Sequence, residues 1–300
     1  MKTRFLNLIF ILFAICSCDK GGTNNINDLE YLKTTIQYKT LTNIDPNLLS
    51  LDVYYNNQVS NKRPLVIYVH GGGWSIGDKT SQLENKINLF RSLNYVFISI
   101  NYRLSPFPFD TANTNRIKYP DHNNDVADAL KWINDNIEQY GGDNNKMALL
   151  GHSAGAHLVA LSGSNGNFLE QRGLSLLIIK GVAVIDTEGF DVLEQVENGD
   201  NQNMYINAFG TNTTENIDAS PLYNITNGTE YPEFFIAKRG SAQRIGYANE
   251  FISKLENNGV EVYQVNGSIY THEEINNAIG APGEILITEP LKQFFIKCFE

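Results

Sequence analysis

The amino-acid sequence predicts an α/β protein with a mostly parallel central sheet and helices on both faces. Three observations lead to this prediction. Short apolar runs recur along the chain, helical patterns fill the gaps between them, and turn residues separate the two kinds of segment. Strands that alternate with helices in this way form parallel sheets, because each crossover helix packs on one face of the sheet. The 300 residues, of which 42% are hydrophobic, suffice for one large core.

The strands are predicted from apolar or alternating runs. Residues 49–54 and 260–265 alternate apolar and polar side chains, as half-buried strands do. Residues 65–69 and 95–100 are apolar on both faces, which suits the interior of a parallel sheet. Shorter runs of the same series lie at residues 147–150, 181–185 and 234–237.

The helices are predicted from apolar residues that recur on one face. The clearest helix spans residues 123–140, and glycines follow it, as is common just past helix ends. Two further helices are expected at residues 248–257 and 289–298. The Asn- and Thr-rich stretch 198–229 is interpreted as loops or as a cap over the sheet.

The first residues predict export and lipid anchoring. Residues 1–17 combine a basic tip with an apolar stretch too short to span a bilayer, which is typical of a secretory signal peptide. The sequence Ile-Cys-Ser-Cys that ends at Cys18 resembles a bacterial lipobox, with cleavage before Cys18 and acylation of its thiol. We therefore expect a flexible tether over residues 18–30, a domain over residues 31–300, and membrane contact in the cell envelope through the lipid only.

Composition argues against several other partners. The formal net charge is −10 and no cluster of Lys and Arg is present, so a nucleic-acid partner is not expected. No group of Cys, His and Asp has metal-ligand spacing, and we expect neither a metal nor an organic cofactor. Besides Cys18, the exported chain would keep one thiol, Cys298, so no internal disulfide is expected.

Residues 151–155, Gly-His-Ser-Ala-Gly, end a predicted strand and open a predicted helix. A sharp strand-to-helix turn leaves little room beside it, so glycine is favoured on both flanks. The serine at the apex has a strained backbone and an exposed hydroxyl. The N-terminus of the following helix directs the Ala154 N–H toward a reacting carbonyl group. The sequence therefore predicts Ser153 as a nucleophile and Ala154 as a donor to the oxyanion.

Residues 70–74, His-Gly-Gly-Gly-Trp, follow the apolar strand 65–69 directly. Without Cβ atoms, the backbone N–H groups of such a loop can approach a substrate oxygen closely. We therefore expect Gly72 and Gly73 to supply the second half of an oxyanion hole. His70 and His152 lie inside the two turns and are interpreted as residues that brace them.

These motifs, together with Asn-Tyr-Arg-Leu-Ser-Pro at 101–106, resemble the esterase branch of the α/β-hydrolase superfamily. That branch includes hormone-sensitive-lipase-like, feruloyl-esterase-like and kynurenine-formamidase-like enzymes. The resemblance extends from about Leu51 to the end of the chain and implies the α/β-hydrolase fold. It also implies a serine, an acid and a histidine in chain order, with the histidine in a loop after the last strand. Of the five histidines, His272 has that position.

The acid that should orient His272 is missing from its usual position. In many relatives the penultimate strand ends in a His-Gly-x-x-Asp turn, and Gln243 stands here in place of that aspartate. A neutral amide cannot offset the positive charge that develops on the imidazole. Asp186, at the end of strand 181–185, is the preferred replacement.

Other arrangements of the acid remain open in the sequence. Glu273 or Glu274 could fold back onto the histidine, or the site could work as a dyad without a carboxylate. Arg239 and Arg244, near the expected site, could bind an anionic group of a substrate or pair with Asp or Glu.

The sequence thus predicts a serine hydrolase that cleaves carboxylic esters through an acyl-enzyme. The resemblance implies small-molecule or carbohydrate-linked esters, such as acetyl or feruloyl groups on carbohydrates. An amidase or formamidase with the same groups is the alternative enzyme. A weakly active binding lipoprotein with an incomplete triad is the alternative outside enzymes.

Overall fold

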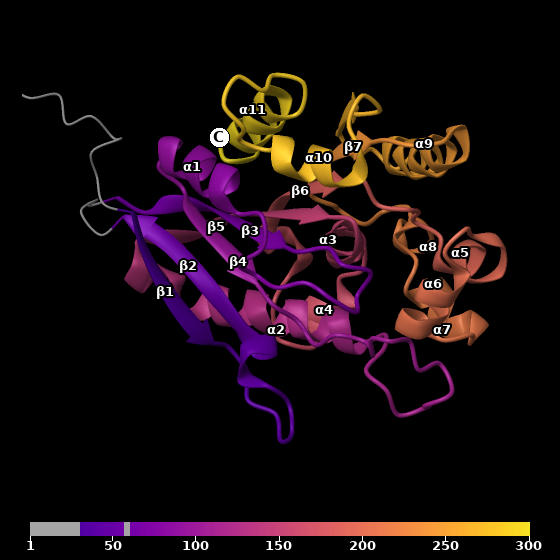
Figure 1. The fold of residues 1–300 in the computed structure, drawn as a ribbon. Coiled ribbons are helices and arrows are strands. Elements are labelled where there is room, and N and C mark those ends of the chain that lie inside the picture. Colours follow the sequence, from indigo (N-terminus) through magenta and orange to yellow (C-terminus); the bar gives the residue numbers. More distant parts are fainter. Residues whose placement is uncertain (1–30, 57–60) are drawn as a thin grey trace, which may run out of the picture.

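The computed structural model describes residues 31–56 and 61–300, which form an α/β structure around one mixed sheet (Figure 1). Its strand order is β1-β2-β4-β3-β5-β6-β7-β8. The pairs β1–β2 and β2–β4 are antiparallel, and every other pair is parallel. The predicted fold class is therefore confirmed. The strands are β1 (Tyr31–Gln37), β2 (Ser50–Asn56), β3 (Arg63–Val69), β4 (Val96–Ile100), β5 (Gly142–His152), β6 (Ile179–Ile185), β7 (Glu233–Lys238) and β8 (Val262–Asn266).

Each face of the sheet has its own apolar core, because successive side chains of a strand point to opposite faces. Leu65, Ile67 and Val69 of β3 pack in one core, and Val66 and Tyr68 pack in the other. The first core is closed by α2 (Asp121–Asn136), α3 (Ala154–Ser164), α4 (Asn167–Glu170) and α9 (Ala242–Glu256), and the second by α1 (Glu84–Ser92), α10 (His272–Ala278) and α11 (Thr288–Cys298).

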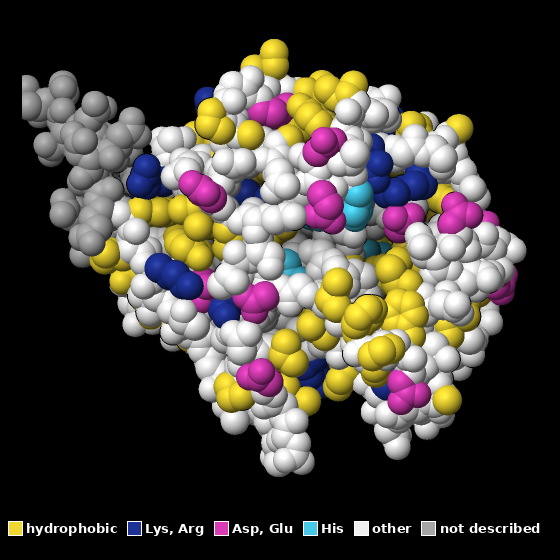
Figure 2. Space-filling model, viewed as in Figure 1, with side chains coloured by type: hydrophobic (Ala, Val, Ile, Leu, Met, Phe, Trp, Pro, Cys, Tyr) yellow, Lys and Arg dark blue, Asp and Glu magenta, His cyan; other side chains and the backbone are white. Residues whose placement is uncertain are grey.

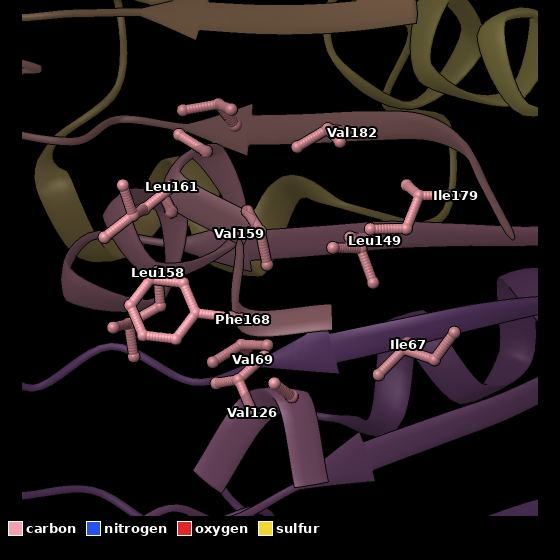
Figure 3. Close-up of a cluster of buried hydrophobic side chains, with 14 of the residues drawn as sticks. Ile67, Val69, Val126, Leu149, Leu158, Val159, Leu161, Phe168, Ile179 and Val182 are labelled. Atoms are coloured by element: carbon pink, nitrogen blue, oxygen red, sulfur yellow. The ribbon is translucent and has the colours of Figure 1, made fainter. Parts of the chain in front are cut away.

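Figure 3 shows the centre of the first core, where side chains of β3, β5 and β6 meet those of the helices. The labelled side chains are Ile67, Val69, Val126, Leu149, Leu158, Val159, Leu161, Phe168, Ile179 and Val182. Helix α3, which follows β5, is buried along its whole length. A helix buried on all sides cannot shift easily, so this core fixes the turn between β5 and α3.

Most of residues 198–229 lies in short helices, so the interpretation of this segment as loops is wrong there, and its interpretation as a cap stays a prediction. α5 (Val192–Asn198), α6 (Gln202–Phe209), α7 (Thr213–Asp218) and α8 (Pro221–Asn224) lie at one end of the molecule (Figure 1). Local capping signals mark two of these helices. The side chains of Asp191 and Asn212 accept hydrogen bonds from the backbone N–H of Glu194 and Glu215, in the pattern of helix N-caps.

Other differences from the predicted elements are small. The helix predicted for residues 123–140 is α2 followed by one 3-10 turn, Ile137–Tyr140. Strand β1 and helix α1 were not predicted. None of the helices in the described ranges is both long and apolar enough to cross a membrane. The signal peptide, Cys18 and the whole of the tether fall on residues 1–30, outside the described residues.

Candidate active site

Ser153 occupies the turn between β5 and α3 in a strained backbone conformation, with φ 57° and ψ −121°. The glycines beside it are required by close backbone contacts. A Cβ on Gly155 would lie 2.1 Å from the carbonyl oxygen of Val69, and a Cβ on Gly151 would lie 2.3 Å from the carbonyl oxygen of Gly155. The packing of α3 against β3 therefore sets the position of the serine hydroxyl.

The structure brings together Ser153, His272 and Asp186, which are far apart in the sequence. Ser153 Oγ lies 2.9 Å from His272 Nε2, and His272 Nδ1 lies 2.7 Å from Asp186 Oδ2. With Nδ1 donating to the carboxylate, Nε2 is free to accept the serine proton. This arrangement can deprotonate the hydroxyl and stabilise the imidazolium that results.

His272 is the first residue of helix α10 rather than part of a loop. Thr271 caps this helix, with its hydroxyl accepting from the Glu274 N–H at 3.3 Å while the Glu274 carboxylate accepts from the Thr271 N–H at 2.8 Å. Glu273 instead accepts a hydrogen bond from Gln82 at 2.8 Å. Neither glutamate therefore acts as the partner of His272, and the cap fixes the backbone from which the imidazole projects.

Asp186 directly follows β6, the neighbour of strand β5, and the segment after β8 brings His272 back to this end of the sheet. The Asp186 N–H donates to Ala237 O at 2.9 Å, and the Asp186 backbone is in the left-handed region with φ 52°. Its side chain is fully buried. Burial alone would raise the pKa of Asp186, but the hydrogen bond with His272 and the guanidinium groups of Arg244 and Arg239 hold it below its ordinary value.

The two arginines pair with acids. Arg239 Nε donates to Asp186 Oδ2, and Arg244 Nη2 donates to Asp186 Oδ1 at 2.7 Å. Arg244 also forms an ion pair with Glu188 at 3.0 Å. The guanidinium groups therefore keep the buried carboxylate ionised and leave it no freedom to rotate.

Gln243 takes no part in this arrangement. It lies in the first turn of α9, its side chain is exposed, and its Nε2 donates to Tyr247 Oη at 2.8 Å. The acid position of many relatives is thus turned away from His272 in this chain.

The glycine loop after β3 is built for close backbone approach. Gly72 and Gly73 both have positive φ, 106° and 57°. A Cβ on Gly72 would lie 2.1 Å from Ile76 O, and one on Gly73 would lie 2.7 Å from Met204 Sδ. Within residues 31–56 and 61–300, the N–H groups of Gly72, Gly73 and Ala154 find no acceptor. They line the same cavity as Ser153 and are available to a substrate oxygen.

Buried aromatic side chains hold this loop in place. Trp74 is only 1% exposed, and its ring makes edge contacts with the rings of His157, Tyr205 and Phe209. These contacts connect the loop to α3 and α6, so the donor groups belong to the rigid core of the molecule.

Both turn histidines are buried, and they make the bracing contacts expected of them. His152 Nε2 donates to the carbonyl oxygen of His272 at 2.9 Å, and His70 Nδ1 donates to Gly71 O at 2.8 Å. The first contact joins the residue before the serine to the backbone of His272. The Gly-His-Ser-Ala-Gly motif could not predict this contact, because His272 lies 120 residues further along the chain.

Buried histidines predict that the fold is sensitive to acid. Burial lowers the pKa of His122 and His152 to about 3 and that of His157 to about 4. In the unfolded chain a histidine titrates near pH ~6.5. The unfolded chain therefore binds more protons below that pH, and stability falls as the pH drops toward 4.

We expect His157→Gln to weaken this pH dependence. The glutamine can donate to Ala219 O as His157 Nε2 does, but it does not titrate. The free energy of unfolding of the variant should fall less steeply, by up to about 1.4 kcal/mol per pH unit between roughly pH 6 and 4. Denaturant titrations of both proteins across that range measure the two slopes, and equal slopes would contradict the assignment.

A cavity of about 500 Å³ opens above Ser153. Figure 2 shows a hollow in this face of the molecule with histidine side chains inside it. The cavity walls come from the glycine loop, the segment 76–82, the segment after β6, α6 and α10. Besides Ser153 and the three histidines His70, His152 and His272, the polar side chains among the lining residues are Tyr68, Ser81, Gln82, Thr187, Glu188, Asn201, Glu273 and Asn276.

One group of side chains in the described part of the chain is close enough to bind a metal ion. His152, Asp186 and His272 offer possible ligand atoms within 4.8 Å of one another. Both ring nitrogens of His272 are hydrogen-bonded to Ser153 and Asp186, and the His152 Nε2 faces a carbonyl oxygen. These contacts fit an acid–base site better than a metal centre.

The fold and this group of residues define a class of protein. A serine on the turn after a central strand of a mostly parallel sheet, hydrogen-bonded to a histidine and a buried aspartate, is the arrangement of α/β-hydrolases. Comparison with known families gives the same result. Residues 51–247, more than half of the chain, match the model of the BD-FAE family of bifunctional feruloyl and acetyl esterases. The chain belongs to this family.

Curated relatives share only part of their length with this chain. Esterase LipQ of Mycobacterium tuberculosis is 35% identical over 119 residues, which are 39% of this chain and 26% of that protein. Para-nitrobenzyl esterase of Bacillus subtilis is 28% identical over 165 residues, 52% of this chain and 34% of the relative. The chain thus matches about a quarter to a third of each of these relatives.

Solved structures share the fold over most of the chain. Esterase B of Lactobacillus rhamnosis superposes with a TM-score of 0.69 at 20% identity, covering 89% of this chain and 86% of that one. A truncated carbohydrate esterase from gut microbiota gives a TM-score of 0.67 at 14% identity, with coverage of 93% and 99%. At these identities the likeness establishes the fold.

Proposed function

We propose that the protein is a serine esterase that hydrolyses carboxylic esters, with acetyl or feruloyl esters of carbohydrates as the substrate class. The observation that carries the proposal is the hydrogen-bonded series Ser153–His272–Asp186 beside unpaired backbone N–H groups. Membership of the BD-FAE family supports the substrate class.

The geometry accounts for each step of such a reaction. Ser153 Oγ attacks the acyl carbon while His272 Nε2 takes its proton. The N–H groups of Gly72, Gly73 and Ala154 stabilise the negative charge on the carbonyl oxygen, at roughly 3 kcal/mol for each donor. The acyl–oxygen bond then breaks, and His272 returns the proton to the leaving alcohol. Water repeats the sequence on the acyl-enzyme and releases the acid.

Asp186 assists this reaction through its hydrogen bond with His272 Nδ1. Its ionised carboxylate fixes the ring with Nδ1–H toward the acid and stabilises the imidazolium. The binding-lipoprotein alternative depended on an incomplete triad. Since a buried carboxylate lies 2.7 Å from His272 Nδ1, that reason for reduced turnover no longer holds.

The proposal is tested with the purified protein on two kinds of reagent. We expect hydrolysis of p-nitrophenyl acetate and of acetylated or feruloylated oligosaccharides, together with covalent labelling by a fluorophosphonate probe. A folded protein that shows neither hydrolysis nor labelling would overturn the proposed function.

We further propose that the protein is exported and held at the cell envelope by a lipid on Cys18. The lipobox-like sequence that ends at Cys18, after a basic and apolar leader, supports this location. Expressed in a bacterium, the wild-type chain should collect in the membrane fraction, and Cys18→Ala should shift it to the soluble fraction. Continued membrane association of the variant would rule out the lipid anchor, and Cys298→Ala serves as the matched control.

A further inference from the structure

A chain of hydrogen bonds lines the cavity next to His272. Tyr68 Oη donates to Asn276 Oδ1 at 3.1 Å, Asn276 Nδ2 donates to Gln82 Oε1, and Gln82 Nε2 donates to Glu273 Oε2 at 2.8 Å. All four side chains line the cavity. Each amide accepts a hydrogen bond on one side and donates one on the other, so the chain runs in one direction. It ends on the Glu273 carboxylate, which offers only acceptors.

The four side chains Tyr68, Gln82, Glu273 and Asn276 form one wall of the cavity, and a buried lysine lies behind this wall. Lys86 is fully buried, and its ammonium group donates to Asn276 O at 2.8 Å and to Gln82 O at 3.1 Å. The same group lies 5.1 Å from the centre of the Tyr68 ring. Lys86 therefore ties together three segments, β3, the turn before α1, and α10.

Two further features, the backbone of Gln82 and the environment of Lys86, indicate that surrounding contacts enforce the conformation of this wall. Gln82 has φ 55°, a conformation that is unfavourable for a residue with a side chain and is retained where surrounding contacts enforce it. Burial lowers the pKa of Lys86 to about 7, which shows that its charged form is costly at this place. Within the described residues no carboxylate pairs with Lys86 to offset that cost. The lysine and the strained turn together hold the backbones from which the side chains of Gln82 and Asn276 project.

The position of the wall determines which half of an ester it meets. In the proposed reaction His272 Nε2 gives its proton to the leaving oxygen, so the alcohol half lies against this imidazole. Glu273 follows His272 directly, and Asn276 lies one turn further along α10. Ile76 and Met204 supply apolar lining from other segments. Figure 2 shows acidic side chains beside a histidine on one rim of the hollow and hydrophobic side chains on the opposite rim.

We propose that Glu273 and Gln82 form a subsite that binds hydroxyl groups on the alcohol half of the substrate. The inference rests on the proposed esterase function and assigns residues to its choice of alcohol. Both side chains are exposed to the cavity, and a carboxylate accepts strong hydrogen bonds from hydroxyl groups. An alcohol without hydroxyl groups would cover these polar atoms without replacing their bonds to water, which weakens its binding.

A matched pair of acetates tests the subsite. A monoacetylated methyl pyranoside and cyclohexyl acetate carry the same acyl group on six-membered rings, and only the former has ring hydroxyls. We expect the wild-type protein to prefer the pyranoside ester by about tenfold or more in kcat/KM. Glu273→Leu should bring this ratio close to one, and Glu273→Gln should give an intermediate ratio. Glu289→Leu, a change of the same kind on exposed α11 surface, is the matched control and should keep the wild-type ratio.

The possible outcomes separate the subsite from the esterase itself. Hydrolysis of p-nitrophenyl acetate without preference for the pyranoside ester would overturn the subsite and leave the esterase standing. An equal loss on both acetates in Glu273→Leu would show a structural role only and would also overturn it. A wild-type preference for acetylcholine over both neutral esters would show that Glu273 recognises positive charge rather than hydroxyl groups. Failure to hydrolyse any ester would refute the proposed function.

Discussion

Ser153→Ala is expected to lower kcat for ester hydrolysis by about a million-fold. Among the described residues, the Ser153 hydroxyl is the one hydrogen-bonded to His272 Nε2, with Oγ at 2.9 Å, and is therefore placed to form the acyl-enzyme. The oxyanion donors and the cavity remain in the variant, so a small residual rate over the uncatalysed reaction should persist. Stopped assays with p-nitrophenyl acetate and labelling with a fluorophosphonate probe measure the two effects.

Ser162→Ala is the matched control for this experiment. Ser162 lies on the same helix, α3, and its buried hydroxyl donates to Leu158 O at 2.8 Å, away from the cavity lining. This variant should keep both its turnover and its labelling. Labelling of Ser153→Ala at the wild-type rate would mean that another residue is the nucleophile.

Asp186→Asn is expected to lower kcat by about ten-thousand-fold, with a much smaller effect on KM. An amide cannot stabilise the imidazolium, and it can hold His272 in the wrong tautomer. The change also removes the negative charge shared by Arg239 and Arg244, so the free energy of unfolding should fall as well. Steady-state kinetics on protein shown to be folded by circular dichroism separates the two consequences.

Gln243→Ala and Glu188→Gln serve as controls for the acid. Gln243 occupies the usual acid position of many relatives and contacts Tyr247, so its loss should leave kcat almost unchanged. Glu188→Gln weakens one ion pair of Arg244 but keeps the carboxylate beside the histidine. A wild-type kcat in Asp186→Asn, or a large loss in Gln243→Ala, would show that the acid has been assigned to the wrong residue.

The residues that could be located from the sequence are those whose geometry is local. Ser153 and Ala154 lie on one turn, and Gly72 and Gly73 lie on another, so residue type and the flanking strands are enough to place them. His272 required the chain order that the family resemblance implies. The fold class followed from periodicity, whereas β1 and α1 were missed. The polar exposed side of β1 and the short length of α1 give weak periodic signals.

The contacts that the acid makes with its partners depend on how the sheet is assembled. The sequence favoured Asp186 but left Glu273, Glu274 and a dyad open, because Asp186 follows β6 and His272 follows β8, and sequence spacing contains no measure of the distance between them. The pairing of Asp186 with Arg239 and Arg244 has the same origin. The contact between His152 and the His272 carbonyl, and the lysine behind α10, join segments more than a hundred residues apart. No local pattern marks such contacts.

The exposed position of Gln243 bears on any attempt to engineer this protein toward its relatives. Gln243→Asp, which places an aspartate where the family resemblance leads one to expect it, would add a negative charge one residue from Arg244, on a side chain directed at solvent. A carboxylate directed at solvent would bring no partner to the imidazole, and Asp186 would keep its contacts with Arg239, Arg244 and His272. The substitution would therefore add a charge to the surface without supplying an acid to the active site.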